Sequence, residues 1–208
     1  EFVGHIARRD FPAAYAAVKD ANALPAICGR VCPQESQCEG VCMRGRKGEA
    51  VGIGRLERFI ADWAEEHPDE AVRALAERRA AHLAARADAA GAAADAEEIT
   101  PLGGKAVPVI PPGTDLSAFR VAVVGSGPAS LTCAGELAKA GASVTVFEAL
   151  HAVGGVLTYG IPEFRLPNSV VEAEIDGLRS LGVNFVKDCV VGKTLSYDDL
   201  HSLGYKGV

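Results

Sequence analysis

The sequence has little of several things that would define its class. It contains one Met and one Trp among 208 residues, and aromatic residues make up 6% of it. No run of about 18 apolar residues occurs, which argues against a membrane-spanning helix. The chain shows no basic segment followed by an apolar run at its start, so we expect no signal peptide and a cytoplasmic location. Acidic residues outnumber basic ones by 27 to 21, for a net charge of −6, which argues against a general nucleic-acid-binding protein.

Cysteine, by contrast, is abundant and clustered. Four of the six cysteines lie close together, at Cys28, Cys32, Cys38 and Cys42. In a chain without a secretory signal, such a cluster indicates metal ligands before disulfides. The C-x3-C-x5-C-x3-C spacing matches neither a zinc ribbon nor a bacterial ferredoxin, and taken alone it is compatible with one [4Fe–4S] cluster or one zinc ion. The isolated Cys133 and Cys189 are expected to be small core residues.

The first half of the chain is expected to be helical around this cysteine segment. Apolar spacing predicts one helix over residues 1–24 that ends at Pro25, and an amphipathic helix over 53–63 that Pro68 interrupts. Residues 26–50 are expected to form loops and turns. An Ala-rich stretch at 71–96 predicts a solvated helix, and a Pro- and Gly-rich stretch at 100–116 predicts a linker or wrapping loop.

The second half alternates short apolar runs with helical patterns. Strands are predicted at 121–124, 143–147 and 183–186, and helices at 128–140 and 168–181. Strand–helix–strand alternation implies a parallel sheet with crossover helices, so this half is of the α/β class.

A glycine-rich turn follows the first of these strands. Gly125 permits a tight turn, and Gly127 lets the backbone approach a pyrophosphate at the start of the next helix. Ser130 stands where the G-x-G-x-x-G pattern has its third glycine, and it is small enough for close packing. Glu148 ends the second strand, where a carboxylate binds a ribose 2′-hydroxyl and disfavours the 2′-phosphate of NADP.

A second glycine pair, Gly154-Gly155, follows shortly after the acidic residue. It allows another close approach to an extended dinucleotide, which favours FAD over NAD. Arg165 lies in the turn-rich stretch beyond it and faces either the cofactor or a surface acid.

Longer stretches resemble a known family. Three stretches of the first half resemble the N-terminal iron–sulfur domain of the glutamate synthase small (beta) subunit, namely Ile27–Glu35, Gln37–Cys42 and Gly52–Ile60. Val124–Pro128 and Val146–Pro167, including GGVLTYGIPEFRLP, resemble the FAD domain of that family. The same module occurs in the large subunit of bifurcating NADH-dependent ferredoxin:NADP oxidoreductase and in dihydropyrimidine dehydrogenase.

The resemblance implies a domain plan. A small, mostly α-helical iron–sulfur domain is expected at 1–62, an Ala-rich helical linker with a Pro/Gly loop at 63–117, and the first part of a Rossmann-like FAD-binding domain with a parallel sheet at 118–208. It also implies that the chain is a fragment, because upstream cysteine ligands and the NADPH-binding domain of the family are missing from it.

The resemblance further implies an oxidoreductase subunit. In the family, electrons pass from NAD(P)H through FAD to [4Fe–4S] clusters and then to a partner subunit, either like the glutamate synthase large subunit or linked to ferredoxin. No nucleic-acid or membrane partner is implied, and no side chain is expected to act as a catalytic acid, base or nucleophile. A bifurcating transhydrogenase or a dihydropyrimidine dehydrogenase-like reductase is the alternative enzyme. A docking fragment without cofactors and a zinc-bound structural module are alternatives of other classes.

Site residues carry over from the family position by position. Cys32, Cys38 and Glu57 are implied as ligands of one cluster and Cys42 as a ligand of the other, whereas Cys28 matches a position that is not a ligand. The positions implied to contact FAD are Val31, Gly125, Ser126, Gly127, Pro128, Ala129, Glu148, Gly154, Gly155, Leu157, Arg165 and Val191.

Overall fold

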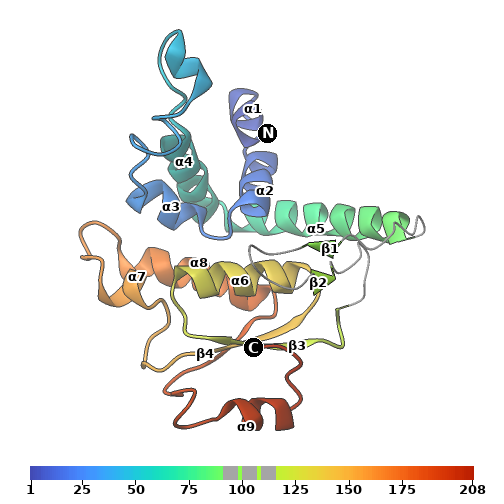
Figure 1. Ribbon diagram of the computed structural model, residues 1–208. Helices are drawn as coiled ribbons and strands as arrows, with labels where there is room; N and C mark the ends of the chain where they lie inside the picture. The colour runs from blue at the N-terminus through green and yellow to red at the C-terminus, as the bar shows by residue number, and fades with distance from the viewer. Residues whose placement is uncertain (91–97, 100–106, 109–115) are drawn as a thin grey trace.

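The computed structural model describes residues 1–90, 98–99, 107–108 and 116–208. Figure 1 shows stacked layers, with helices α1–α5 at the top, α6–α8 below them, then a sheet, and α9 on the far side of the sheet. The upper elements are α1 (Phe2–Ala7), α2 (Phe11–Ala21), α3 (Pro25–Val31), the 3-10 turn η1 (Met43–Arg46), α4 (Ile53–Glu66) and α5 (Pro68–Ala90). The lower elements are β3 (Arg120–Val124), α6 (Pro128–Lys139), β4 (Ser143–Phe147), α7 (Val156–Tyr159), α8 (Asn168–Ser180), β5 (Asn184–Val186) and α9 (Tyr197–Ser202).

The sheet is parallel, as the alternating pattern predicts. Its strands lie in the order β3-β4-β5, with Val121 opposite Val144 and Val146 opposite Phe185. Gly207 forms a parallel bridge to Val121 on the other side of β3. The chain order therefore reverses direction beside β3, and open α/β sheets bind ligands at the carboxyl end of a strand at such a switch point.

The largest apolar core lies between the sheet and the helices above it. It combines sheet residues such as Val144 and Val146 with Leu131 of α6 and Leu178 of α8. Residues from the helical half enter the same core, namely Ala23, Leu24 and Ile27. The helical half and the Rossmann-like half are therefore packed together through apolar contacts, although the predicted boundaries between them at 62/63 and 117/118 stay a prediction.

The opposite face of the sheet is covered by α9. Phe147 and Tyr205 pack there edge to face with their ring centroids 5.6 Å apart, together with Ala122 and Leu200. Cys189 is buried in this core, as expected. The expectation for Cys133 is wrong, because α6 turns Leu131, Ala134 and Ala138 inward and leaves Cys133 exposed.

The helical half has a small core of its own, in which Ala14, Val18 and Ile60 are buried. The single helix predicted over 1–24 is wrong. Arg9 adopts a left-handed φ of 61°, and the Asp10 carboxylate accepts a hydrogen bond from the Ala13 N–H (3.2 Å) to start a second helix. Pro25 begins α3 instead of ending a helix, because proline lacks an N–H and fits the first helical turn.

Helix α5 confirms the helix predicted for the Ala-rich stretch as far as residue 90. It packs on α2, its Ala71 and Ala74 side chains are buried, and Arg78 forms ion pairs with Glu1 and Asp20. Within the stretch predicted as a loop, Val107–Pro108 (β2) pairs with Glu98–Ile99 (β1). Residues 100–106 and 109–115 of the predicted loop, and residues 91–96 of the predicted helix, lie outside the described residues.

In the part of the chain that the structure describes, no helix is both long and apolar enough to cross a membrane.

Two helical glycines give opposite predictions for stability. A Cβ at Gly29 would lie 2.7 Å from the backbone nitrogen of Arg58 on α4, whereas a Cβ at Gly177 of α8 would meet no atom within 4 Å. We expect Gly29→Ala to lower the free energy of unfolding by about 1–3 kcal/mol through overpacking of α3 on α4. Gly177→Ala should raise it by about 0.5–1 kcal/mol, because alanine favours the helix. Urea unfolding followed by circular dichroism measures both, and a destabilisation by Gly177→Ala equal to that by Gly29→Ala would contradict the packing argument.

Candidate dinucleotide site and cysteine segment

The glycine-rich turn connects β3 to α6 at the switch point of the sheet. Gly125 has a φ of +86°, which L side chains rarely adopt, and its N–H donates to the Phe147 carbonyl oxygen (2.8 Å) at the end of β4. Gly127 is the N-cap of α6 and provides no side-chain cap, and Pro128 occupies the first turn. Pro128 and Ala129 are exposed. The start of α6 is therefore open, and its free N–H groups and positive dipole end suit a phosphate.

The Glu148 carboxylate accepts the hydrogen bonds that connect the segments of this region. The side chain of Glu148 is only 5% exposed, and one carboxylate oxygen accepts the Ser126 N–H (2.9 Å) and the Ser126 hydroxyl. The other oxygen accepts the Leu150 N–H (2.8 Å). The predicted acidic residue and the predicted turn are thus brought into direct contact.

The second glycine pair meets the same turn. The Gly154 N–H donates to the Ser126 hydroxyl oxygen (3.0 Å). Gly155 has a φ of +55°, and a Cβ there would lie 3.0 Å from the Gly127 Cα. Both glycine motifs and Glu148 therefore form one continuous backbone surface, which we call the cradle (Gly125–Gly127, Glu148, Gly154 and Gly155).

Gly127 tests whether the cradle fits a ligand. Its φ of −68° is open to any residue, and a Cβ built on it would meet no atom within 4 Å. The fold by itself does not require a glycine there. The space that a methyl group would occupy is instead the space through which a dinucleotide pyrophosphate approaches, so the cradle fits such a group.

The other predicted cofactor contacts lie at different depths. Leu157 is buried in the main core, and Val31 packs against that core from the end of α3. Val191 packs against the core below the sheet. The side chain of Arg165 is exposed, beside the fully exposed turn residue Phe164. Their roles toward a cofactor stay predictions.

The cysteine segment begins on α3, which is packed closely on α4. Gln34 occupies the space beside Gly54 and its side-chain amide donates to the Cys28 carbonyl oxygen (3.3 Å) at the end of α3. Cys28 lies on α3 and Cys32 is its C-cap, while Cys38 and Cys42 lie in the turns before η1. Gly54 thus has a structural reason in the packing of Gln34, because a Cβ there would overlap the Gln34 side chain.

The polar groups around the cysteines differ in their ionisation. Burial raises the pKa of the Cys28 thiol to about 11, and the neighbouring Cys32 and Glu57 also raise it. Burial likewise raises the pKa of Glu57, whose carboxylate accepts a hydrogen bond from the Asn22 amide (2.7 Å). The backbone N–H groups of Val51, Gly45 and Arg44 hold the pKa of the Cys42 thiol below its usual value. The Cys42 thiol therefore ionises more readily than the Cys28 thiol.

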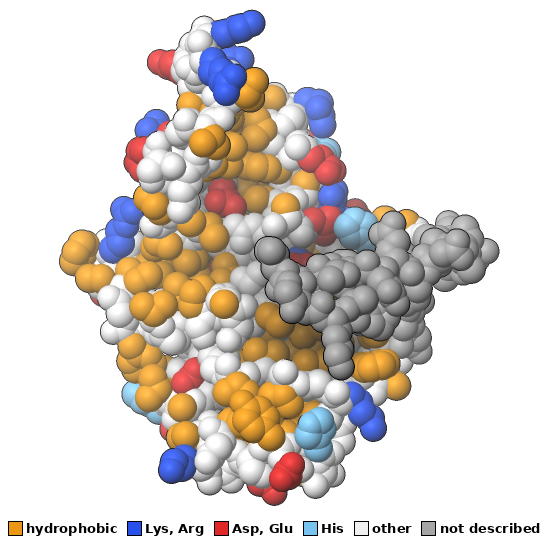
Figure 2. All heavy atoms as spheres, in the orientation of Figure 1, with side chains coloured by type: hydrophobic (Ala, Val, Ile, Leu, Met, Phe, Trp, Pro, Cys, Tyr) orange, Lys and Arg blue, Asp and Glu red, His pale blue; other side chains and the backbone are white. Residues whose placement is uncertain are grey.

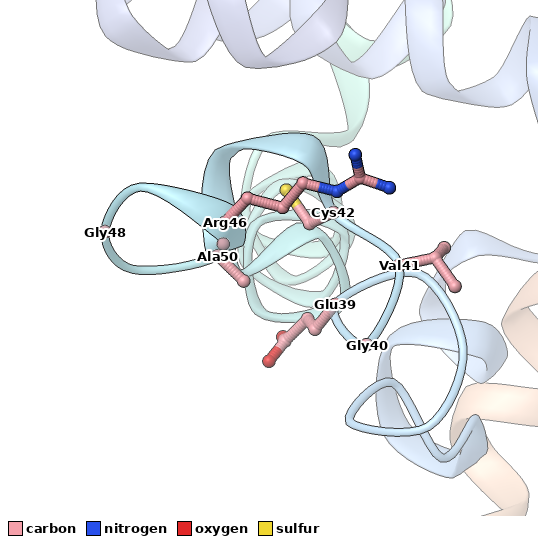
Figure 3. Close-up of a pocket in the computed structure, with 8 residues that line it drawn as sticks. Glu39, Gly40, Val41, Cys42, Arg46, Gly48 and Ala50 are labelled. Atoms are coloured by element: carbon pink, nitrogen blue, oxygen red, sulfur yellow. The ribbon is translucent and has the colours of Figure 1, made fainter.

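The segment around Cys42 forms a projecting tip. Figure 3 shows the pocket there, with a volume of about 450 Å³, and the labelled side chains of Cys42, Glu39 and Arg46 on its rim. Arg44, Arg46 and Lys47 are exposed, and Figure 2 shows basic side chains gathered at the top of the molecule. Val41 and Met43 are also exposed, at 77% and 69%.

The predicted cluster ligands do not converge on one point. Within the described ranges, no group of three or more His, Cys, Asp or Glu side chains lies close enough to hold a metal ion. Cys32, Cys38 and Glu57 supply suitable donor atoms but are not gathered at one point. The geometry of these residues therefore does not by itself fit a closed cluster.

Sequence reasoning missed several polar residues of this region. Local patterns do not predict three of these contacts. They are the Ser126 hydroxyl between Glu148 and Gly154, the Asn22 amide that donates to Glu57, and the Gln34 amide that donates to the Cys28 carbonyl oxygen. Glu174 was also missed, although it stands on α8 one turn after Val170 and one turn before Leu178, on the predicted apolar face. A carboxylate on such a face was the available signal, because an acid is buried only when it is paired.

Comparison with known proteins matches two separate parts of the chain to different families. Residues 1–69 match the family described as dihydropyrimidine dehydrogenase domain II, 4Fe-4S cluster, and residues 123–175 match the NAD(P)-binding Rossmann-like domain. The chain is 32% identical over 200 residues to the NAD-dependent dihydropyrimidine dehydrogenase subunit PreT of Escherichia coli O157:H7, covering 96% of this chain and 39% of PreT. It is 32% identical over 181 residues to the glutamate synthase [NADPH] small chain of Escherichia coli (strain K12), covering 87% of this chain and 30% of that protein.

The chain thus spans 39% of the length of PreT and 30% of the length of the small chain. The likeness extends across both halves, and the two matched families agree with the helical half and the cradle that the structure shows. Over this part of their length, the chain is therefore similar to oxidoreductase subunits that include the glutamate synthase small chain and PreT.

Proposed function

We propose that the chain is the iron–sulfur and first flavin-binding part of an electron-transfer subunit of the glutamate synthase small-chain type. The single observation that carries this proposal is the cradle, in which both glycine motifs and Glu148 meet through Ser126. The match of residues 1–69 to a 4Fe-4S domain supports the iron–sulfur part. The proposed location is the cytoplasm.

The cofactor proposed for the cradle is FAD, which when bound takes up a hydride and gives up electrons singly. The second glycine pair supports FAD, since Gly155 lies directly against Gly127 and extends the smooth surface beyond the first turn. Gly127 leaves room for the pyrophosphate, and the start of α6 offers it N–H groups. Glu148 is buried and already oriented by three donors, and its carboxylate keeps acceptor capacity that supports its proposed role toward a ribose hydroxyl.

A nicotinamide dinucleotide is a second candidate for the same cradle. The match of residues 123–175 to an NAD(P)-binding domain favours it, and the Gly125–Gly127 turn alone suits either dinucleotide. Titration of the chain with FAD and separately with NADH distinguishes the two. Tighter binding of NADH than of FAD would overturn the flavin assignment.

For the iron–sulfur part, Cys32, Cys38, Cys42 and Glu57 are the proposed ligands, and additional thiolates must complete any cluster, since the described residues do not close one. PreT and the small chain are each named as parts of a larger enzyme. By extension, we propose a partner subunit that accepts the electrons, of the glutamate synthase large-subunit type or linked to ferredoxin.

Gly127→Ala separates ligand binding from folding. Because the added methyl group meets no protein atom, the melting temperature should fall by no more than about 4 °C, which allows about 1 kcal/mol for replacing glycine at the N-cap of α6. The same methyl group should raise the Kd for FAD by roughly tenfold or more, a loss of about 1.4 kcal/mol. Flavin fluorescence titration measures the affinity, and Gly177→Ala serves as the control because its methyl group also meets open space but lies away from the cradle. Equal FAD affinity in the two variants would contradict the proposed binding site.

Glu148→Gln tests the ribose contact. The amide keeps the volume of the side chain but places an N–H₂ group where one carboxylate oxygen now accepts hydrogen bonds. We expect a roughly tenfold weaker FAD affinity, because a hydrogen bond to a charged group contributes about 1.5–3 kcal/mol, together with a lower melting temperature. Glu172→Gln is the matched control, since Glu172 is an exposed acid whose nearest basic partner is Arg179 at 3.4 Å. Isothermal titration calorimetry measures both variants, and an unchanged affinity in Glu148→Gln would refute the ribose assignment.

A further inference from the structure

The two halves of the chain meet around one buried acid. Ala23, Leu24 and Ile27 of the helical half pack into the same apolar core as Leu131 and Leu178. Within this apolar junction lies Glu174 of α8, which is 6% exposed. An unpaired carboxylate in such a place is costly, so its partners explain why it is there.

Each oxygen of Glu174 has a partner from the helical half. One oxygen accepts a hydrogen bond from the Lys19 ammonium (2.7 Å) at the end of α2. The other accepts the backbone N–H of Ala26 (2.8 Å) in the first turn of α3. Lys19 is 12% exposed and also donates to the Ala23 carbonyl oxygen (2.8 Å), so it is itself held in place.

The bond to Ala26 has the role of a helix cap. The N-cap residue of α3 is Leu24, whose side chain has no capping oxygen, and Pro25 has no N–H to satisfy. The Glu174 carboxylate therefore supplies from α8 the acceptor that a Ser or Asp would ordinarily supply at the N-cap. Its negative charge also lies at the positive end of the α3 dipole.

Helix α3 is the element that the hydrogen bond to Glu174 holds in position. It carries Cys28 and ends at Cys32, and Val31 on the same helix packs against the core that includes Leu157 beside the cradle. Figure 1 shows α3 lying directly over α7 and α8. A rotation of α3 on α8 would therefore move the Cys32 thiol relative to the cradle.

We propose that Glu174 is a positioning residue that, held by Lys19, caps α3 and fixes the cysteine-bearing helix in one orientation on the Rossmann-like half. The significance of this orientation for electron transfer rests on the proposed function, whereas the docking itself is a property of the folded chain. The three hydrogen bonds around the Lys19–Glu174 pair define one orientation, which apolar contacts alone do not. Buried ion pairs often add little net stability, so orientation and stability are separable here.

Two double variants isolate the cap. Lys19→Met with Glu174→Gln removes both charges and keeps a carbonyl oxygen for the Ala26 N–H. Lys19→Met with Glu174→Leu removes both charges and also the acceptor, while keeping a similar volume. Both are expected to fold, because replacing a buried ion pair with apolar side chains is commonly tolerated. Asp176→Asn on the exposed face of α8 is the control for a lost acid, since Asp176 pairs only with Arg179 among the described residues.

Hydrogen–deuterium exchange at the Ala26 amide is the first readout. We expect exchange roughly tenfold faster or more in the Leu double variant than in the Gln double variant, with Asp176→Asn like the wild type. Crystal structures of the two double variants give the positional readout, and we expect the Cys32 Sγ to shift relative to the Gly127 Cα only in the Leu variant. Equal exchange and equal Cys32 positions in the two double variants would overturn the proposal. Should the Leu variant fail to fold, Glu174→Ala with Lys19→Met provides the same comparison with less side-chain volume.

Titration of the same proteins with FAD keeps the two proposals apart. Glu174 does not touch the cradle, so all the variants should bind FAD with the affinity of the wild type within about twofold, less than the effect of one lost contact. If the wild type does not bind FAD, the flavin proposal fails while the exchange at Ala26 still decides the role of Glu174. If FAD binds equally to all and Ala26 exchange does not differ, the positioning role alone is overturned.

Discussion

The hydroxyl of Ser126 joins three segments that are distant in the sequence. It donates to Glu148 at the end of β4 and accepts from the Gly154 N–H, while the Ser126 N–H also donates to Glu148. Because every one of these groups is buried, none has water as a substitute partner. The path of the turn after β3, the exit of β4 and the start of the segment leading to α7 are therefore fixed together. The shape of the cradle depends on this one side chain more than on any of its glycines.

The helical half depends on the Rossmann-like half for much of its burial. Its own apolar cluster is small and is built on Ala14, Val18 and Ile60, with larger aromatic side chains packed around them. Leu24 and Ile27, by contrast, are buried against the helices that cover the sheet. Such an arrangement couples the two halves during unfolding, because separating them exposes the apolar surface of both. The cysteine segment beyond α3 is anchored chiefly through α3 and α4.

Much of the second half could be predicted from local patterns. The run Ser143–Phe147 and the helix that starts at Pro128 have the expected bounds, because apolar periodicity and proline placement are local signals. The convergence of Gly125, Glu148 and Gly154 was also predictable, since the ends of adjacent parallel strands must meet. The helical half was predicted less well. Asp10 and Pro25 both stand at helix starts. A proline at this position is compatible with the end of one helix or the start of the next, and the start is stabilised by Glu174 of α8, which accepts the Ala26 N–H.

The long-range polar contacts could not be predicted at all. Nothing local to Lys19 or Glu174 specifies that they meet, because the two residues are 155 positions apart and are brought together only when the helical half packs on the Rossmann-like half. The same holds for Gln34 and Gly54. Gly54 on α4 has to be a glycine because the Gln34 side chain, from the turn after α3, fills the space beside it. Cys133 shows the converse, since a small apolar residue on a helix is placed by the rotation of that helix, which the core decides.

The bridge between Gly207 and Val121 also affects how the sheet can meet other molecules. The Ala122 N–H donates to the Gly207 carbonyl oxygen (2.9 Å) and the Lys206 N–H to the Arg120 carbonyl oxygen (2.7 Å), so the outer side of β3 is already paired. At the opposite edge of the sheet, within the described residues, lies β5, which has only three residues. Lys187 and Asp188 follow it, and Asp188 turns the backbone away at a φ of 56°. A short edge that ends in charges and a reversed turn is a poor template for another strand, so this edge is protected against edge-to-edge aggregation.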